Sequence, residues 1–152
     1  LSLDKLFVER LYEVLFSEES PFKTQRKVLV VHYRLGDLLN LDEKRTINVD
    51  RVEGVLNELM VQTSHLVLLS DSNEAESAEF LKNSVILKFC KPSNYGPNKT
   101  LRFCIDAESF IGTGAKISLW AAIFRYFVHE KESFLPTELN WSSGNGLRAN
   151  WY

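Results

Sequence analysis

The stretch KVLVVHYRLGD, residues 27–37, is an apolar run that ends in His, Arg, Gly and Asp. Its four consecutive aliphatic residues predict a strand buried on both faces, as in a parallel sheet, because the run is too short for a core helix. Open α/β sheets bind their ligands just beyond the carboxyl ends of such strands. The planar guanidinium of Arg34 can donate two hydrogen bonds to paired phosphate oxygens. We therefore interpret His32, Arg34, Gly36 and Asp37 as a candidate phosphate site, with a plain polar turn as the alternative.

Length and charge narrow the class of protein. A chain of 152 residues is most simply one domain, and a domain of this size buries about two thirds of its unfolded surface. Apolar residues make up 45% and charged residues 25%, as in an ordinary globular protein. The net charge of -2 gives no electrostatic basis for nonspecific nucleic-acid binding. We therefore expect a single domain over residues 1–152 and no nucleic-acid partner.

The cysteines and the N-terminal segment bear on location. Two cysteines, Cys90 and Cys104, are too few for a disulfide framework, which favours a reducing compartment and a cytoplasmic protein, although one bridge stays open. No apolar run reaches the roughly 18 residues of a membrane span, and Asp4, Glu9 and Arg10 stand where a signal peptide is apolar. The chain does not begin with Met, so we expect a processed product or a piece of a longer protein.

Strand and helix patterns alternate along the chain. Apolar runs predict strands at residues 27–33, 65–70, 85–89 and 110–112. Helical spacing predicts an N-terminal helix within residues 1–20 and further helices over 48–60, 73–81, 100–106 and 115–127. Asn48 and Asn73 are suited to cap the helices over 48–60 and 73–81. Residues 38–46 and 91–99 resemble loops. The pattern predicts a doubly wound Rossmann-like parallel sheet with helices on both faces, and Trp141, Trp151 and Tyr152 indicate that the tail, residues 129–152, packs on it.

Polar residues follow three of the predicted strands. Parallel strands place their carboxyl ends along one edge of a sheet, so residues 32–37, 70–72 and 112–118 are expected to face one cleft. Ser70, Asp71 and Ser72 can hydrogen-bond a base or a ribose. Asp71 and Ser72 are equally suited to cap the helix that follows.

The glycine turn before the last predicted helix is the second candidate phosphate site. Gly112, Thr113 and Gly114 open a helix whose first N–H groups and dipole favour an anion. Thr113, Lys116 and Ser118 add side-chain donors. The alternatives are that Lys116 is an exposed helix lysine and that Ser118 bonds its own backbone.

Several common site motifs are missing from the sequence. It contains no GxGxxG dinucleotide motif, no phosphate-binding GxxxxGK[ST] loop, no HExxH zinc motif and no GxSxG nucleophile turn. His32, His65 and His129 fall on separate predicted elements. We therefore expect neither a metal site nor a bound cofactor.

Three segments together resemble one enzyme family. Residues 31–37, VHYRLGD, resemble the HxRxGD motif of the α-1,2-, α-1,6- and protein O-fucosyltransferases. Residues 68–72, LLSDS, are similar to the second motif of that family, a strand that ends in Ser or Thr followed by Asp. Residues 110–122, FIGTGAKISLWAA, resemble the third motif, with Ala115 and Lys116 where the family has paired serines and Leu119 at its first Trp. The resemblance covers about residues 27–127.

The resemblance implies the donor-binding domain of an inverting, metal-independent glycosyltransferase of the GT-B architecture, with GDP-fucose as donor substrate. Arg34 is then the catalytic residue that holds the diphosphate and stabilises charge on the departing GDP. His32 and Asp37 shape its loop, and Ser118 with the backbone of residues 113–116 binds the phosphates. Where the family has serine hydroxyls, Lys116 offers a full charge, or the donor differs from GDP-fucose.

The resemblance also implies partners. A GT-B enzyme has two Rossmann-like domains, and the glycan acceptor binds the other one. A chain of 152 residues has room for the donor half, so we expect the acceptor domain and the general base to lie outside it. The alternative is a noncatalytic nucleotide-binding or interaction module on the same scaffold, since fold does not fix activity.

Overall fold

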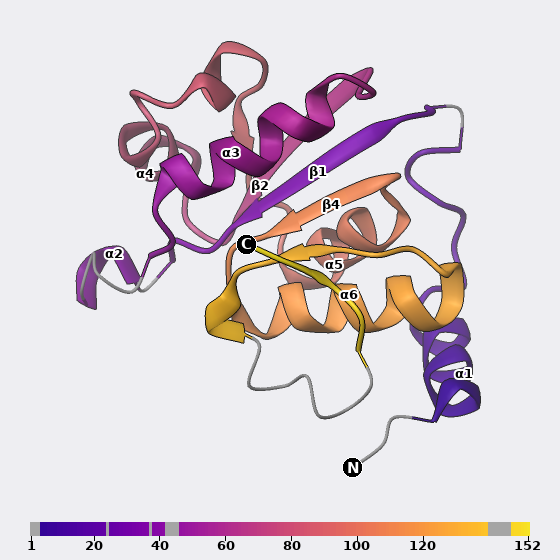
Figure 1. Cartoon of the computed structure of the whole chain (residues 1–152). Helices are drawn as coiled ribbons and strands as arrows, with labels where there is room; N and C mark the ends of the chain where they lie inside the picture. Colours follow the sequence, from indigo (N-terminus) through magenta and orange to yellow (C-terminus); the bar gives the residue numbers. More distant parts are fainter. Residues whose placement is uncertain (1–3, 24, 37, 42–45, 140–146) are drawn as a thin grey trace.

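A six-stranded parallel sheet forms the centre of the protein (Figure 1). The structure is a computed structural model that describes residues 4–23, 25–36, 38–41, 46–139 and 147–152. The strands are β1 (Val28–Tyr33), β2 (His65–Ser70), β3 (Pro92–Ser93), β4 (Ser109–Gly112), β5 (Phe134–Leu135) and β6 (Asn150–Trp151). Their order in space is β3-β2-β1-β4-β5-β6, the order of a Rossmann sheet. The α/β prediction is confirmed.

Strand β1 lies at the middle of the sheet and all six of its residues are buried. Val28 and Val30 belong to the core on one face, and Leu29, Val31 and Tyr33 belong to the core on the other. Successive side chains of a strand point to opposite faces of the sheet, and helices cover both faces here. No position of β1 therefore turns its side chain toward water. This explains why β1 is a continuous apolar run in the sequence.

Helices cover both faces of the sheet (Figure 1). Helix α3 (Val49–Met60) packs on the face that holds Leu29, with α4 (Glu74–Phe80) farther toward β3. The opposite face is covered by α5 (Pro97–Asp106) and α6 (Ala115–His129). Helix α1 (Lys5–Leu15) lies outside this layer and contacts α6 through ring pairs such as Tyr12 with Phe124, whose centroids are 5.9 Å apart.

The predicted N-caps are confirmed for α3 and α4. The side-chain oxygen of Asn48 accepts a hydrogen bond from the backbone N–H of Asp50 at 2.8 Å. That of Asn73 accepts one from the N–H of Glu76, also at 2.8 Å. Each cap satisfies one of the amides that has no partner inside the first turn of its helix.

The third strand was predicted in the wrong place. Residues 85–89 are not a strand, because Val85–Lys88 form a 3₁₀ helix, here called η2. Its start is fixed by Glu53 of α3, which accepts hydrogen bonds from the hydroxyl of Ser84 at 2.6 Å and the N–H of Val85 at 2.9 Å. The N–H of Val85 is therefore bonded to a side chain and is not available to a neighbouring strand.

Two predicted loops contain regular structure instead. Within residues 91–99, Pro92–Ser93 form edge strand β3, and α5 begins at Pro97, earlier than expected. Proline suits the first position of a helix, and Gly96 before it has a φ of 79°, which favours glycine. Within residues 38–46, Leu38–Leu41 form the short helix α2, and residues 42–45 lie outside the described part of the chain.

The tail does more than pack on the domain. It contributes β5 and β6, which pair in parallel and extend the sheet beyond β4. Tyr152 also donates its hydroxyl hydrogen to the carbonyl oxygen of Gly112 at 2.9 Å. Trp141 lies outside the described residues.

The cysteines and the helix lengths bear on the predicted location of the protein. Both cysteines, Cys90 and Cys104, are free thiols. Among the residues that the structure describes, no helix combines the length and the apolarity needed to cross a bilayer.

Candidate functional site

The candidate site lies where the strand order of the sheet reverses. Strand β1 is followed in sequence by helices that lead to β2 on one side, whereas β4 pairs with β1 on its other side. Ligands of open α/β sheets bind at this position, beyond the carboxyl ends of the two central strands. Arg34 follows β1 and Thr113 follows β4, so the structure brings the first and third sequence motifs together there (Figure 1).

Two hydrogen bonds join the β1 loop to the β4 turn. The backbone N–H of Arg34 donates to the hydroxyl oxygen of Thr113 at 2.8 Å. The N–H of Thr113 donates to the carbonyl oxygen of His32 at 3.1 Å. The hydroxyl of Thr113 therefore orients the backbone of Arg34, in addition to its predicted role as a phosphate donor.

Asp71 holds the loop that carries Arg34. Its Oδ1 accepts hydrogen bonds from the N–H of Leu35 at 2.8 Å and of Gly36 at 3.0 Å. Its Oδ2 lies 2.9 Å from Nε of Arg34. A Cβ at Gly36 would come within 2.6 Å of this carboxylate, so the close approach requires glycine. The second motif thus positions the first, a role that the sequence did not indicate.

His32 and Ser118 form a buried polar pair beneath the site. Nδ1 of His32 lies 3.2 Å from the hydroxyl oxygen of Ser118, and their exposed fractions are 1% and 0%. A Cβ at Gly112 would come within 2.6 Å of Ser118, so glycine makes room for this side chain. Ser118 is therefore directed toward His32, below the surface on which we expected it to meet phosphate.

Burial decides the charge of His32. Desolvation lowers the pKa of the imidazole to about 4, with Asp71 opposing and Arg34 adding to the shift. The ring is therefore neutral at pH 7 and adds no positive charge to the site. Within the described part of the chain, its Nε2 has no hydrogen-bond partner.

A pocket of about 300 Å³ opens at these strand ends. It is lined by Arg34, Leu38, Ile47, Thr113, Gly114, Pro136, Glu138 and Leu139. We call it the switch-point pocket. The guanidinium of Arg34 contacts Asp71 through Nε. The side chain is nevertheless 29% exposed, so part of it reaches the surface.

The N-terminus of α6 borders the switch-point pocket. Gly114 precedes the first turn with a φ of 141°, a conformation open to glycine, and no side chain caps the helix there among the described residues. The first N–H groups and the helix dipole favour an anion at this end. Lys116 is exposed on the first turn of α6 and is not among the residues that line the pocket.

The serines of the second motif lie inside the protein. The hydroxyl oxygen of Ser70 accepts the N–H of Ser72 at 3.1 Å, and the hydroxyl of Ser72 donates to Oε2 of Glu76 at 2.5 Å. Both serines are buried, and neither lines the pocket. The predicted base and ribose contacts therefore stay predictions, as do the roles of Asp37, which lies outside the described residues.

Sequence reasoning missed Glu138 and Arg51. Glu138 lines the pocket, and its carboxylate forms a bidentate ion pair with Arg51 of α3. The Nη1–Oε1 and Nη2–Oε2 distances are 2.5 and 3.0 Å. Hydrogen bonding to Arg51 keeps the pKa of Glu138 below its usual value, so this carboxylate is charged. The two residues are 87 positions apart, and no local pattern links them.

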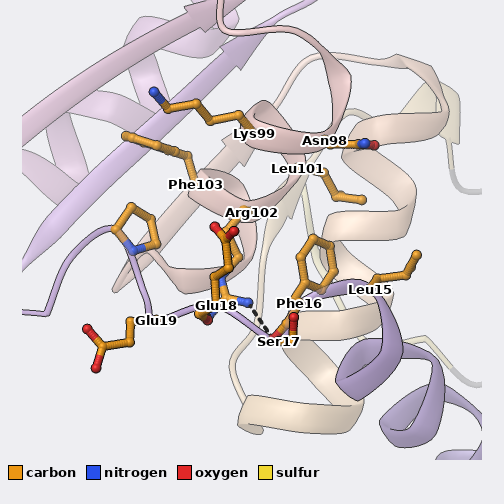
Figure 2. A pocket seen from close by; sticks show the side chains of 11 residues that line it. Leu15, Phe16, Ser17, Glu18, Glu19, Asn98, Lys99, Leu101, Arg102 and Phe103 are labelled. Carbon is orange, nitrogen blue, oxygen red and sulfur yellow. Dashed lines mark hydrogen bonds between the residues drawn. The ribbon is translucent and has the colours of Figure 1, made fainter.

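A larger pocket, of about 610 Å³, lies away from these strand ends, between the end of α1 and α5 (Figure 2). Its charged lining residues are Glu18, Glu19, Lys99 and Arg102, and the Lys99 ammonium lies over the ring of Tyr95, 4.3 Å from its centroid. The guanidinium of Arg102 already donates to the carbonyl oxygens of Phe16 at 3.2 Å and Glu18 at 3.1 Å. The switch-point pocket is smaller, but it lies at the carboxyl ends of β1 and β4, the position at which open α/β sheets bind ligands.

Neither a metal-ligand group in the described residues nor a match to a family model or curated protein adds to this site. Among the described residues, no three His, Cys, Asp or Glu side chains are grouped as metal ligands would be. No protein-family model and no curated protein matches the chain.

Proposed function

We propose that this protein binds the diphosphate of a nucleotide sugar and serves as the donor domain of a glycosyltransferase, with GDP-fucose or a related GDP-sugar as substrate. One observation carries the proposal: Arg34, Thr113 and Gly114, from two different strand ends, line one pocket at the N-terminus of α6. A partly exposed guanidinium beside uncapped helix N–H groups matches the needs of a diphosphate. The three-motif resemblance supplies the identity of the donor.

In the transfer that we propose, a hydroxyl oxygen of a glycan attacks the anomeric carbon of the sugar. The bond from that carbon to the phosphate oxygen breaks, and its electron pair leaves with GDP. Arg34 and the dipole of α6 stabilise the charge that develops on this oxygen, without a metal ion. The hydroxyl proton passes to a base that we place on the acceptor-binding domain. We also propose a cytoplasmic location, with which two free thiols are compatible.

Thermal unfolding of the chain with GDP, GDP-fucose, UDP, ATP and NAD tests the donor assignment. A ligand at 100 times its Kd stabilises the native state by about 2.7 kcal/mol, or roughly 5–10 °C in Tm for a chain of this size. We expect GDP and GDP-fucose to raise Tm and the other three ligands to have little effect. Failure of both guanine nucleotides to raise Tm would remove the proposal.

The alternative, a noncatalytic nucleotide-binding module, predicts the same stabilisation without chemistry. The two are separated by release of GDP from GDP-fucose in the presence of glycan acceptors, measured with the chain alone and with any acceptor domain of the same protein. Release that depends on the acceptor supports the transferase. Binding without release in both settings supports the module.

A further inference from the structure

The switch-point pocket is divided by charge. One end has Arg34 and the N-terminus of α6, and the other has the ionised Glu138. Arg34 follows β1 and Glu138 follows β5, with β4 between them, so the ends of these two strands are about two strand spacings apart, roughly 10 Å. The N-terminus of α6 follows β4 and lies between them. A ligand that fills the pocket is therefore expected to be anionic at the Arg34 end and neutral or positively charged at the Glu138 end.

The walls between the two ends are largely apolar. They are formed by Leu38, Ile47, Pro136 and Leu139. A sugar ring has apolar C–H faces and hydroxyl groups at its rim, so it can contact such walls and still donate hydrogen bonds. A pocket of about 300 Å³ has room for one hexose ring.

Glu138 is prepared to accept those hydrogen bonds. Arg51 fixes the carboxylate through both oxygens, and Arg51 is itself held by donating to the carbonyl oxygen of Tyr152 at 2.7 Å. The hydroxyl of Thr137 also donates to Oε2, at 3.4 Å. A carboxylate has about four acceptor sites, so the bonds from Arg51 and Thr137 still leave acceptor capacity for a ligand. The side chain of Glu138 is 54% exposed, and the carboxylate is therefore open to solvent and to a bound sugar.

We propose that Glu138, oriented by Arg51, is the sugar-recognition residue of this pocket, accepting hydrogen bonds from the ring hydroxyls of a neutral hexose whose phosphate lies at the Arg34 end. The inference rests on the proposed function, since it assumes that the phosphate is that of a nucleotide sugar. It adds a residue from the tail that the three sequence motifs do not contain. It also excludes, at this end of the pocket, donors whose sugar carries a carboxylate.

Calorimetric titration of the chain and its Glu138→Ala variant with GDP and with GDP-fucose tests the inference. Removing the carboxylate should weaken GDP-fucose binding about tenfold, because charge-assisted hydrogen bonds to the ring are lost. The same change should leave GDP binding as tight or tighter, because a negative charge near the phosphates is gone. Glu138→Gln, which keeps an acceptor oxygen, should fall between the wild type and Glu138→Ala for GDP-fucose.

Glu79→Ala is the matched control, because Glu79 is also an exposed glutamate in an ion pair, with Lys82 at 2.6 Å, and does not line the pocket. It should change neither affinity. If Glu138→Ala weakens both ligands equally, or tightens both, Glu138 does not recognise the sugar and the inference is overturned. If the wild type fails to bind GDP at all, the proposed function fails as well, so the two failures are distinguishable.

Discussion

The two ends of α6 each lie near an arginine, and the two arginines are held in opposite ways. Arg34 borders the N-terminus of α6, is 29% exposed and is oriented by the carboxylate of Asp71. Arg125 lies in the second half of α6 and is completely buried. The guanidinium near the N-terminus of α6 therefore lines a pocket, whereas the guanidinium in the second half of α6 is buried inside the protein.

Arg125 is saturated by the protein itself. Its guanidinium donates to the hydroxyl oxygen of Ser133 and to the carbonyl oxygens of Cys104, Ile105, Ala107, Glu108 and Glu132, at distances of 2.6–3.2 Å. These acceptors belong to the end of α5, the link from α5 to β4 and the segment before β5. Burial lowers the pKa of Arg125 to about 10, which leaves it charged at pH 7. It joins three segments by supplying hydrogen-bond donors to their carbonyl groups, of which those of Cys104, Ile105 and Ala107 are bonded in the buried interior.

The comparison separates a structural arginine from a ligand-binding one. Every donor direction of Arg125 is directed at backbone or Ser133, so no ligand is needed to explain its burial. Arg34 is positioned by Asp71 and Thr113 at the edge of a pocket, where part of its surface faces solvent. Three experiments test whether the two arginines differ in this way, in order of decreasing expected effect.

Arg125→Met should lower the free energy of unfolding by about 3–5 kcal/mol, because it leaves several buried carbonyl groups without donors. Unfolding in urea measures the loss. Arg10→Met, at an exposed position of α1, is the control and should have little effect. A loss below about 1 kcal/mol for Arg125→Met would show that water replaces the guanidinium and that the junction is not buried in solution.

Acidification should act through His32, beneath the other end of α6. The folded-state pKa is about 4 and the unfolded value is 6.5, so the unfolded chain binds more protons between these values. Stability is therefore fully present above pH 6.5 and falls as the pH drops, by about 2 kcal/mol at pH 5. Urea unfolding at pH 7, 6 and 5 measures the slope.

His32→Asn is the control for that slope, because asparagine keeps a polar group near Ser118 but does not titrate. The variant should be less stable at pH 7 and should lose most of the dependence between pH 7 and pH 5. An unchanged slope in His32→Asn would assign the pH dependence to other groups.

Arg34→Lys should weaken GDP binding about tenfold, or about 1.4 kcal/mol, while the free energy of unfolding changes little. Lysine keeps the positive charge but loses the fork that can bond two oxygens at once. Calorimetric titration with GDP measures the affinity, and Arg10→Lys serves as the control. Equal GDP affinity in Arg34→Lys and the wild type would place Arg34 with Arg125 among the structural arginines.

The sequence alone was sufficient for the elements with strong local patterns. The apolar run of β1, the apolar stripes of α3 and α6 and the caps at Asn48 and Asn73 predicted an α/β sheet with helices on both faces, because each signal is contained in a short window. The same reasoning placed Arg34 and the turn at Gly114 at strand ends. Strands β3, β5 and β6 were not predicted, because two residues each are too few to show a period of two.

Contacts between distant segments were decided by the tertiary structure. The carboxylate of Asp71 reaches Leu35 across 36 positions, the hydroxyl of Ser118 reaches His32 across 86, and Glu138 reaches Arg51 across 87. Arg125 illustrates the same limit, since its charge in the sequence favours an exposed position, whereas the carbonyl groups that surround it exist only after folding. The sequence determined which segments form strands, helices and polar turns. The packing of those segments determined which polar groups pair with one another and which remain at the pocket, because hydrogen bonding depends on where the chain crosses itself.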